Sequence, residues 1–251
     1  MVLIRIKIHQ VLYILQICGI FTSTWPPEFK TGKREIFLRD LGWILAILNV
    51  LVSMPLLILG AYYSEDVIRM MKALSELTAL MEVLFNLILC RMERSRLQNL
   101  LAKLKDFLDH SEVQERYIIQ KYINRYTNFS IFVGTSYILA AVTFSCGPLF
   151  LPISLPMEAW YPFSIESIYI KIILYVLQVF AILQTGFCIT VDFMIAMFFW
   201  YPAARLEMLG QELQQITHEN QIKKYIQKHQ EIIRYATVLV SLLYYFLIAS
   251  N

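Results

Sequence analysis

Four apolar stretches, each long enough for a helix to cross a bilayer, constrain this chain more than any other feature. They run over residues 41–63, 67–90, 129–151 and 171–200. A helix needs about 20 apolar residues to cross the hydrocarbon core, and only helices and closed barrels satisfy their backbone hydrogen bonds there. Because 58% of the residues are apolar and 16% are charged, too little polar surface is left to coat a water-soluble domain. We therefore expect an all-α fold, a polytopic bundle of membrane helices.

Lys and Arg residues are distributed unequally between the connections of these stretches. Of the 22 basic residues, only Arg69, Lys72 and Lys171 fall on one side of the expected bundle. The others precede the first stretch, lie between the second and third, or follow the fourth. Cytoplasmic connections carry the excess of Lys and Arg in membrane proteins. We therefore expect residues 1–40, including the amino terminus, in the cytoplasm.

The first 21 residues allow two interpretations. Arg5 and Lys7, followed by apolar residues 11–21, have the order of a secretory signal peptide. No clear small-residue cleavage site follows, and cleavage would place the new amino terminus outside, against the distribution of basic residues. We favour a helix that lies on the inner leaflet.

Two connections have a helical periodicity of their own. Between the second and third stretches, leucines recur every three or four residues opposite basic residues, and this predicts that the second span continues into the cytoplasm as an amphipathic helix. Those leucines are Leu97, Leu100, Leu101, Leu104 and Leu108. After Trp200 the chain is expected to turn at Tyr201-Pro202, and residues 201–236 form a second cytoplasmic helical segment. Acidic residues alternate with the basic ones of residues 91–125, which favours contact with anionic lipid over nucleic acid.

Polar residues inside the spans are candidates for function, because a charge in hydrocarbon is costly. Lys72 and Glu76 are one helical turn apart, as are Glu82 and Asn86, so the members of each pair are expected to interact along one helix face. Asp192 lies between apolar neighbours in the fourth span and has no evident partner in the sequence. We interpret it as an intramembrane polar candidate for function.

The sequence lacks the motifs of catalysis, cofactor binding and metal binding. It has no P-loop and no GxGxxG, GxSxG or HExxH motif, and its four cysteines and four histidines lack the spacing of metal ligands. His218-Glu219 is not followed four residues later by the second histidine of a zinc-binding helix, because Ile222 stands there. We expect no cofactor, no metal and no enzyme activity, and a membrane enzyme is the least favoured alternative.

Three segments resemble the insect odorant receptor family. They are Leu15-x-x-x-Gly19 followed by Trp25-Pro26-Pro27, residues 155–163 (LPMEAWYPF) and residues 228–233 (KHQEII). Their order and their positions relative to the expected spans match the family over residues 1–236. The resemblance implies the first four helices of a seven-helix receptor with a cytoplasmic amino terminus. It also implies an odour-gated cation channel, assembled from a tuning subunit and a shared co-receptor subunit in the plasma membrane of olfactory sensory neurons.

The last residues depart from what this resemblance implies. After Tyr235-Ala236 the family pattern would continue as polar helix before its fifth span, whereas residues 237–251 are apolar at once and too short to cross a bilayer. We expect this tail to be a truncated or alternative end, without the seventh helix that lines the family's pore. On this interpretation the chain conducts no current by itself.

A ligand pocket between the second, third and fourth spans, in the outer half of the bundle, is also implied by the resemblance. A small volatile organic ligand needs mostly apolar walls and a few hydrogen-bonding groups. The candidates are Ser75, Thr78 and Met81 in the second span, Tyr137, Ala141 and Phe144 in the third, and Tyr175, Gln178 and Ile182 in the fourth. Ordinary packing between helices is the alternative interpretation for each of them.

Two functions are compatible with these patterns. The first is an odorant receptor tuning subunit that binds volatile ligands and, when complete and assembled with the co-receptor, gates cation conduction. The second is a four-span structural or adaptor protein of the bilayer without a ligand of its own. Changed ligand selectivity after substitution of Tyr137 or Tyr175 would favour the receptor, and association with the co-receptor without an odour response would favour the adaptor.

Overall fold

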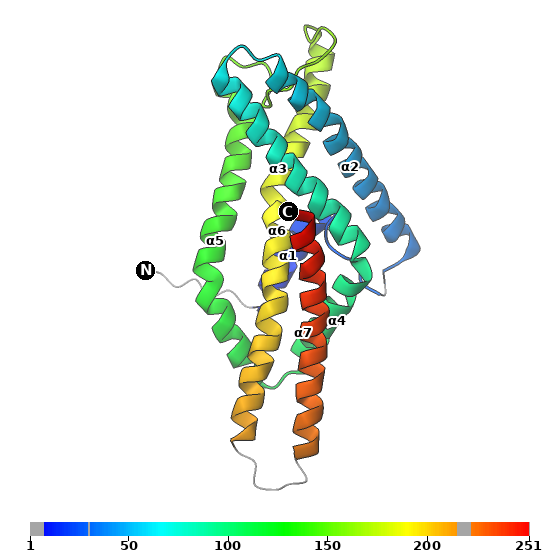
Figure 1. Ribbon diagram of the computed structural model, residues 1–251, viewed down its shortest axis with the longest axis vertical. Helices are drawn as coiled ribbons and strands as arrows, with labels where there is room; N and C mark the ends of the chain where they lie inside the picture. The colour runs from blue at the N-terminus through cyan, green and yellow to red at the C-terminus, as the bar shows by residue number, and fades with distance from the viewer. Residues whose placement is uncertain (1–7, 30, 215–221, 251) are drawn as a thin grey trace.

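A computed structural model of the chain describes residues 8–29, 31–214 and 222–250, the last six of these by their backbone alone. Four residues named above lie outside the described residues, namely Arg5, Lys7, His218 and Glu219. The described residues form helices joined by turns and loops (Figure 1). The helices are α1 (Ile8–Phe21), α2 (Lys33–Tyr62), α3 (Val67–Met92), α4 (Arg94–His110), α5 (Val113–Phe150), α6 (Ile168–Leu213) and α7 (Ile222–Ser250).

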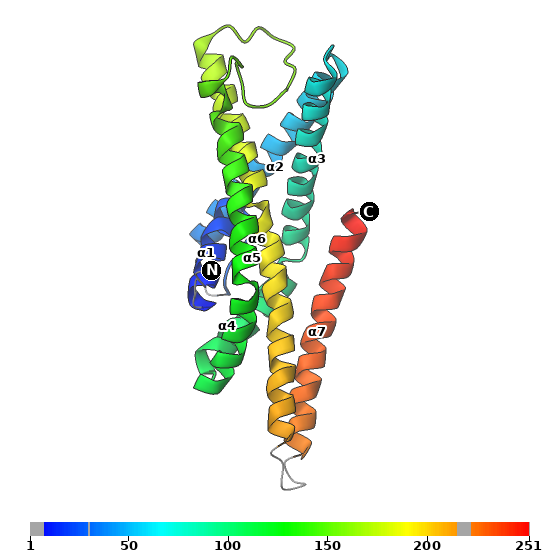
Figure 2. The ribbon, with the colours of Figure 1, turned by 90° about the vertical axis from the view of Figure 1, so that its left-hand side faces the viewer.

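Four of these helices, α2, α3, α5 and α6, have the length and hydropathy to cross a membrane, which confirms the four predicted spans. The turn between α2 and α3 and the loop of residues 151–167 lie at one end of the bundle, which we call the loop end (Figures 1 and 2). The opposite end, which we call the α4 end, is formed by α4, the first turns of α5 and α7, and the last turns of α6 (Figures 1 and 2). α5 and α6 are longer than the predicted stretches because they continue into this end.

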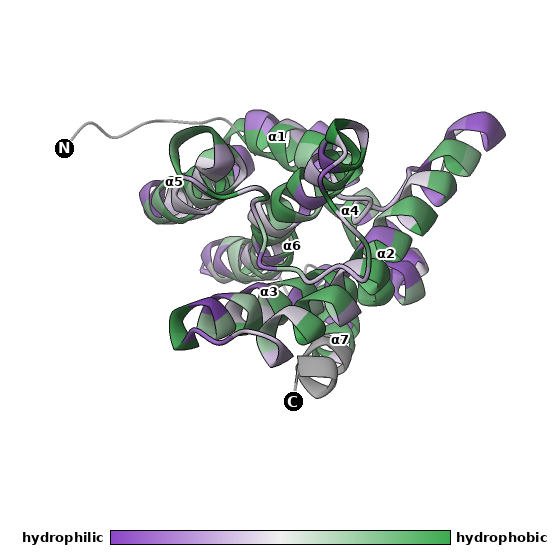
Figure 3. Cartoon of the chain, turned by 90° about the horizontal axis from the view of Figure 1, so that it is seen from above, coloured by the Kyte–Doolittle hydropathy of each residue, from purple (hydrophilic) through white to green (hydrophobic). Residues whose placement is uncertain are grey.

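Large apolar side chains cover the outward faces of the spanning helices. On α2, Leu45, Leu48, Val52 and Ile58 are each more than half exposed. Hydrophobic residues occur on the periphery of the bundle as well as inside it (Figure 3). Each Å² of such surface costs about 25 cal/mol in water, whereas lipid tails solvate it readily. This is the architecture of a multi-pass membrane protein.

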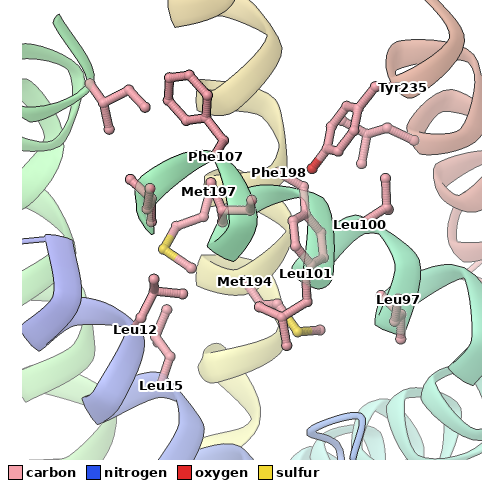
Figure 4. Close-up of a cluster of buried hydrophobic side chains, with 14 of the residues drawn as sticks. Leu12, Leu15, Leu97, Leu100, Leu101, Phe107, Met194, Met197, Phe198 and Tyr235 are labelled. Carbon is pink, nitrogen blue, oxygen red and sulfur yellow. The ribbon is translucent and has the colours of Figure 1, made fainter. Parts of the chain in front are cut away.

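A buried apolar cluster joins α1, α4, α6 and α7 at the α4 end (Figure 4). α1 contributes Leu12 and Leu15, α6 contributes Met194 and Phe198, and α7 contributes Tyr235. The predicted leucine stripe of residues 97–108 supplies the face of α4 that packs against them, and all five of its leucines are buried. The amphipathic pattern of α4 therefore serves to pack this helix against the bundle.

The prediction that the second span continues as one helix is wrong at a single residue. α3 ends at Met92 and α4 begins at Arg94, while Glu93 between them has φ −92° and ψ 13°. The break changes the direction of the chain (Figure 1). α4 can then lie across the bundle, so that Leu97 and Leu100 contact the cluster instead of extending away from it.

The predicted turn at Tyr201-Pro202 is also wrong, because α6 passes through Pro202 and ends at Leu213. A proline inside a helix removes one backbone hydrogen bond and costs about 3 kcal/mol. Here Pro202 is itself buried, and Ala204 and Met208 are buried in the apolar cluster. Packing of this helix face offsets the cost.

α7 is a continuous helix across the boundary at residue 236 that the sequence suggested. Its buried side chains, Ile232, Tyr235, Leu239 and Leu242, recur every three or four residues on both sides of that boundary. They form one face, and α7 packs with it against α6. The apolar residues after Ala236 therefore extend a packing face that begins in the polar half of the helix.

The segment after α1 forms a compact turn around Gly19. The backbone N–H groups of Thr24 and Trp25 both donate to the Gly19 carbonyl, at 2.9 and 3.0 Å. A Cβ atom on residue 19 would lie 2.9 Å from the Cβ of Trp25, so a larger residue would displace the Trp25 side chain, which is buried. Gly19 and Trp25, which carried part of the family resemblance, thus depend on each other sterically.

Candidate ligand-binding cavity

A cavity of about 220 Å³ lies between α3, α5 and α6, toward the loop end of the bundle. α3 supplies Ser75, Glu76, Ala79 and Leu80, α5 supplies Tyr137, Ala140, Ala141 and Phe144, and α6 supplies Ile182, Thr185 and Gly186. Met157, from the loop of residues 151–167, completes the lining. The walls are mostly apolar, with a few polar groups, as small-molecule sites require.

The structure brings together five of the nine predicted ligand residues in this cavity: Ser75, Tyr137, Ala141, Phe144 and Ile182. Sequence reasoning missed the others. Ala79 and Gly186 lie one helical turn after Ser75 and Ile182, so helical periodicity could have found them. Met157 could not be found in this way, because its position depends on how the loop folds back over the helices.

Gln178, predicted to contact a ligand, holds the loop in place instead of lining the cavity. Its Oε1 accepts a hydrogen bond of 2.9 Å from the backbone N–H of Met157, and its Nε2 donates to the Tyr161 hydroxyl at 2.9 Å. Gln178 is 3% exposed, so water does not compete strongly for these bonds. The position of the Met157 wall is therefore fixed from α6.

Further hydrogen bonds tie the same loop to α2 and α3. The Trp160 N–H donates to the Leu56 carbonyl at 2.9 Å, and the Glu158 N–H donates to Oε2 of Glu76 at 3.0 Å. Lys72 Nζ donates to Oε1 of Glu158 at 3.0 Å and lies 3.9 Å from Oε1 of Glu76. The predicted interaction between Lys72 and Glu76 is confirmed, and both residues serve to hold the loop.

Gly60 on α2 permits the closest approach of the loop. A Cβ atom on residue 60 would collide with the Glu158 carbonyl oxygen and would lie 3.3 Å from the Trp160 N atom. The Trp160 ring packs against Tyr63, with ring centroids 5.0 Å apart. The loop thus rests on α2 at a position where only glycine leaves enough room.

The contact between α5 and α6 forms the back of the cavity. A Cβ atom on residue 186 would lie 2.6 Å from the Cβ of Ala141, so Gly186 and Ala141 allow the two helices to approach closely. Tyr175, another predicted ligand residue, lies outside the cavity and braces the same pair of helices. Its hydroxyl donates to the Ser145 carbonyl at 2.9 Å.

Thr78 and Met81, the remaining predicted ligand residues, line a separate groove between α3, α6 and α7 with a volume of about 680 Å³. Glu82 and Asp192 line the same groove. Within the described part of the chain, no ion pair to either carboxylate is found. No Lys or Arg side chain is among the residues that line the groove, so neither carboxylate has a cation beside it there.

The predicted interaction between Glu82 and Asn86 is wrong. Asn86 Nδ2 instead donates a hydrogen bond of 2.7 Å to Sγ of Cys188 on α6, and both residues are buried. Glu82 is left facing the groove. Over residues 8–29, 31–214 and 222–250, no group of three or more His, Cys, Asp or Glu residues has the arrangement of a metal site.

The family model described as 7tm odorant receptor matches residues 65–250. This range contains every residue that lines the cavity. The chain belongs to the 7tm odorant receptor family. The match also includes residues 237–250. The expected truncated or alternative end after Ala236 stays a prediction. Residues 15–27, which carried part of the resemblance, precede the matched range.

The fold of this odorant receptor chain is similar to that of the insect olfactory receptor OR5 from Machilis hrabei. The structure of that receptor in complex with eugenol matches with a TM-score of 0.68 at 17% identity, over 94% of this chain and 66% of that one. A second structure of the receptor matches with a TM-score of 0.70 at 15% identity, over 96% and 68%. The chain thus spans about two thirds of the receptor's length. A search of curated proteins finds no match.

Proposed function

We propose that this chain is the tuning subunit of an odorant receptor and binds a small volatile organic ligand between α3, α5 and α6. The cavity closed by Met157 carries the proposal, because it combines apolar walls with a few polar groups and contacts three helices and a loop. An apolar cavity of about 150 Å³ is large enough to bind benzene. The cavity here, at about 220 Å³, suits a volatile molecule of similar or somewhat greater size.

Cation conduction is proposed for the receptor that this chain forms with the co-receptor subunit, in the plasma membrane of olfactory sensory neurons. A ligand opens a channel only if it binds the open state more tightly than the closed state. A ligand in this cavity contacts Met157 as well as three helices, so a rearrangement of the loop or the helices changes its contacts. We therefore propose that the receptor senses the ligand at the loop end.

We also propose that the α4 end, with the amino terminus, faces the cytoplasm. Basic residues gather at this end, where Arg91 and Arg94 interact with Asp40, and Lys121 donates to Glu207 at 2.8 Å. An excess of Lys and Arg is typical of the cytoplasmic side. Trp and Tyr residues are enriched at membrane interfaces, and the stacked rings of Tyr126 and Trp200, 5.4 Å apart, mark one interface near this end.

Direct binding tests the proposal. The full chain in lipid nanodiscs is equilibrated with a panel of volatile alcohols, esters and terpenes, and retention is measured against empty nanodiscs. Ala79→Phe fills the cavity and lowers affinity at least about tenfold, because a ligand and the new ring cannot occupy the same space. Ala102→Phe, on α4 and away from the cavity, leaves the affinity unchanged. Retention equal to that of empty nanodiscs for the whole panel would contradict the proposal and favour an adaptor.

A further inference from the structure

We infer that the cavity selects ligands carrying a hydrogen-bond donor, such as aliphatic alcohols, over ligands of the same size that only accept. This inference rests on the proposed function, since it concerns the chemistry of the ligand in the same cavity. The geometry that points to it is a buried acceptor without a hydrogen-bond partner, Oε1 of Glu76, on a residue of the otherwise largely apolar cavity lining.

The two oxygens of the Glu76 carboxylate have different surroundings. Oε2 accepts the backbone N–H of Glu158 at 3.0 Å. Oε1 is buried and has no hydrogen-bond partner among the described residues. The Glu76 side chain is 10% exposed, so solvent reaches it poorly. Leaving a buried acceptor without a donor costs about 1–3 kcal/mol, and more for a charged group. A ligand that donates to Oε1 would remove this cost.

Lys72 does not supply that donor. Its Nζ atom is 3.9 Å from Oε1 of Glu76, beyond hydrogen-bond distance, and donates instead to Glu158 at 3.0 Å and to the Pro156 carbonyl at 3.4 Å. The Lys72 ammonium is thus engaged by the loop. It balances the charge of Glu76 at a distance while leaving the hydrogen-bonding position on Oε1 unfilled.

Thr185 adds a second acceptor to the same cavity. Its hydroxyl donates to the Ala181 carbonyl at 3.1 Å, so the lone pairs of its oxygen are the groups it can offer to a ligand. Ser75 and Tyr137 are the lining side chains whose hydroxyls could donate to an acceptor ligand. Both residues are exposed, whereas Oε1 of Glu76 is buried without a hydrogen-bond partner.

Two isomers separate these possibilities. 1-Hexanol and methyl pentyl ether have the same atoms and nearly the same size, but only the alcohol has a donor. We measure retention of each by the full chain in nanodiscs against empty nanodiscs, which removes the difference in lipid partitioning. We expect the alcohol to bind about tenfold to a hundredfold more tightly than the ether, because the ether leaves Oε1 of Glu76 buried without a donor.

Glu76→Gln tests which group is responsible. The Glu158 N–H still requires an acceptor, so the amide oxygen takes the position of Oε2 and the amide NH₂ replaces Oε1. The preference for the alcohol then falls at least about tenfold. Tyr137→Phe removes a hydroxyl that could donate to the ether, so it does not lower the preference for the alcohol. Gln114→Leu, at an exposed position on α5 outside the cavity, is the control and leaves the ratio of the two affinities unchanged.

The outcomes separate this inference from the proposed function. Equal affinities of the isomers in the unmodified chain, or a preference for the ether, would overturn the inference even if Glu76→Gln fails to fold. A preference for the alcohol that Tyr137→Phe abolishes and Glu76→Gln leaves intact would also overturn the inference. If other volatiles bind but neither isomer does, the inference fails and the cavity remains a binding site. If no volatile binds, the proposed function itself fails.

Discussion

Gln178 on α6 accepts the backbone N–H of Met157 at 2.9 Å, and this bond connects a spanning helix to the loop residue that closes the cavity. The bond lies in a buried environment, and the other partner of Gln178 is the Tyr161 hydroxyl in the same loop. The shape of the cavity is therefore coupled to the anchoring of the loop.

Gln178→Leu is expected to release the loop while preserving the bulk of the side chain. The buried Met157 N–H loses its acceptor, which costs about 1–3 kcal/mol. We expect faster hydrogen exchange of the backbone over residues 155–161 and weaker binding of volatiles. Gln114→Leu, at an exposed position on α5, should change neither. Unaltered exchange in the Gln178 variant would show that the loop is held by other contacts.

Two glycine substitutions should have opposite effects on stability. In Gly60→Ala the new Cβ collides with the Glu158 carbonyl, so the loop must move, at a cost of about 1–3 kcal/mol. In Gly210→Ala nothing lies within 4 Å of the new Cβ, and the helix gains about 0.5–1 kcal/mol from the lower backbone entropy of the unfolded chain. Thermal unfolding in detergent measures both. A stable Gly60→Ala chain with unchanged ligand binding would contradict the close contact described here.

The two carboxylates of the groove should each destabilise the isolated chain. Asp192→Asn removes a charge from a spanning helix, where a charge in hydrocarbon costs about 2.5–3.5 kcal/mol, and it removes one of the two carboxylates that line the groove. We expect a higher melting temperature for Asp192→Asn and for Glu82→Gln, and a smaller increase for the double variant than the sum of the two. Additive effects would indicate that the carboxylates do not interact.

Glu28 and Lys105 should make a small contribution to stability that depends on pH. Lys105 donates to the Glu28 carboxylate and holds its pKa below the usual value of 4.5. The contribution is therefore complete above pH 4.5 and is lost as the pH falls through the lowered pKa of the folded state. The Glu28 side chain is 52% exposed, so the contribution is below about 1 kcal/mol.

Unfolding of the unmodified chain and of Glu28→Gln, measured between pH 7 and pH 3, checks this expectation. The two stabilities should differ at neutral pH and converge at the acidic end. A difference that persists at pH 3 would assign the effect to something other than the charge of Glu28.

Hydropathy predicted the four spans because nearly every residue of a helix that crosses hydrocarbon must be apolar. The sequence-based predictions were wrong at Glu93 and at Pro202, where packing decides whether a helix bends or continues. The leucine stripe of α4 turns inward only if the chain breaks at Glu93. Pro202 stays helical because the residues around it are buried. Neither effect is visible in a local window of sequence.

Five of the twelve residues that line the cavity followed from the sequence for a similar reason. Ser75, Tyr137, Phe144 and Ile182 lie on helix faces whose direction is set by the spans. Gln178 also faces inward, but its partner is the loop, and the path of the loop depends on contacts far apart in the sequence, such as that between Trp160 and Leu56. The wall formed by Met157 therefore required the structure.

Photolabelling tests the central claim most directly. A diazirine derivative of a small aliphatic alcohol, activated on the full chain in nanodiscs, marks the residues that it contacts, and mass spectrometry identifies them. The account predicts adducts on the cavity residues Tyr137, Phe144 and Met157 that excess 1-hexanol suppresses. Adducts confined to Phe85 and Phe199 in the groove, or adducts that excess alcohol does not suppress, would contradict it.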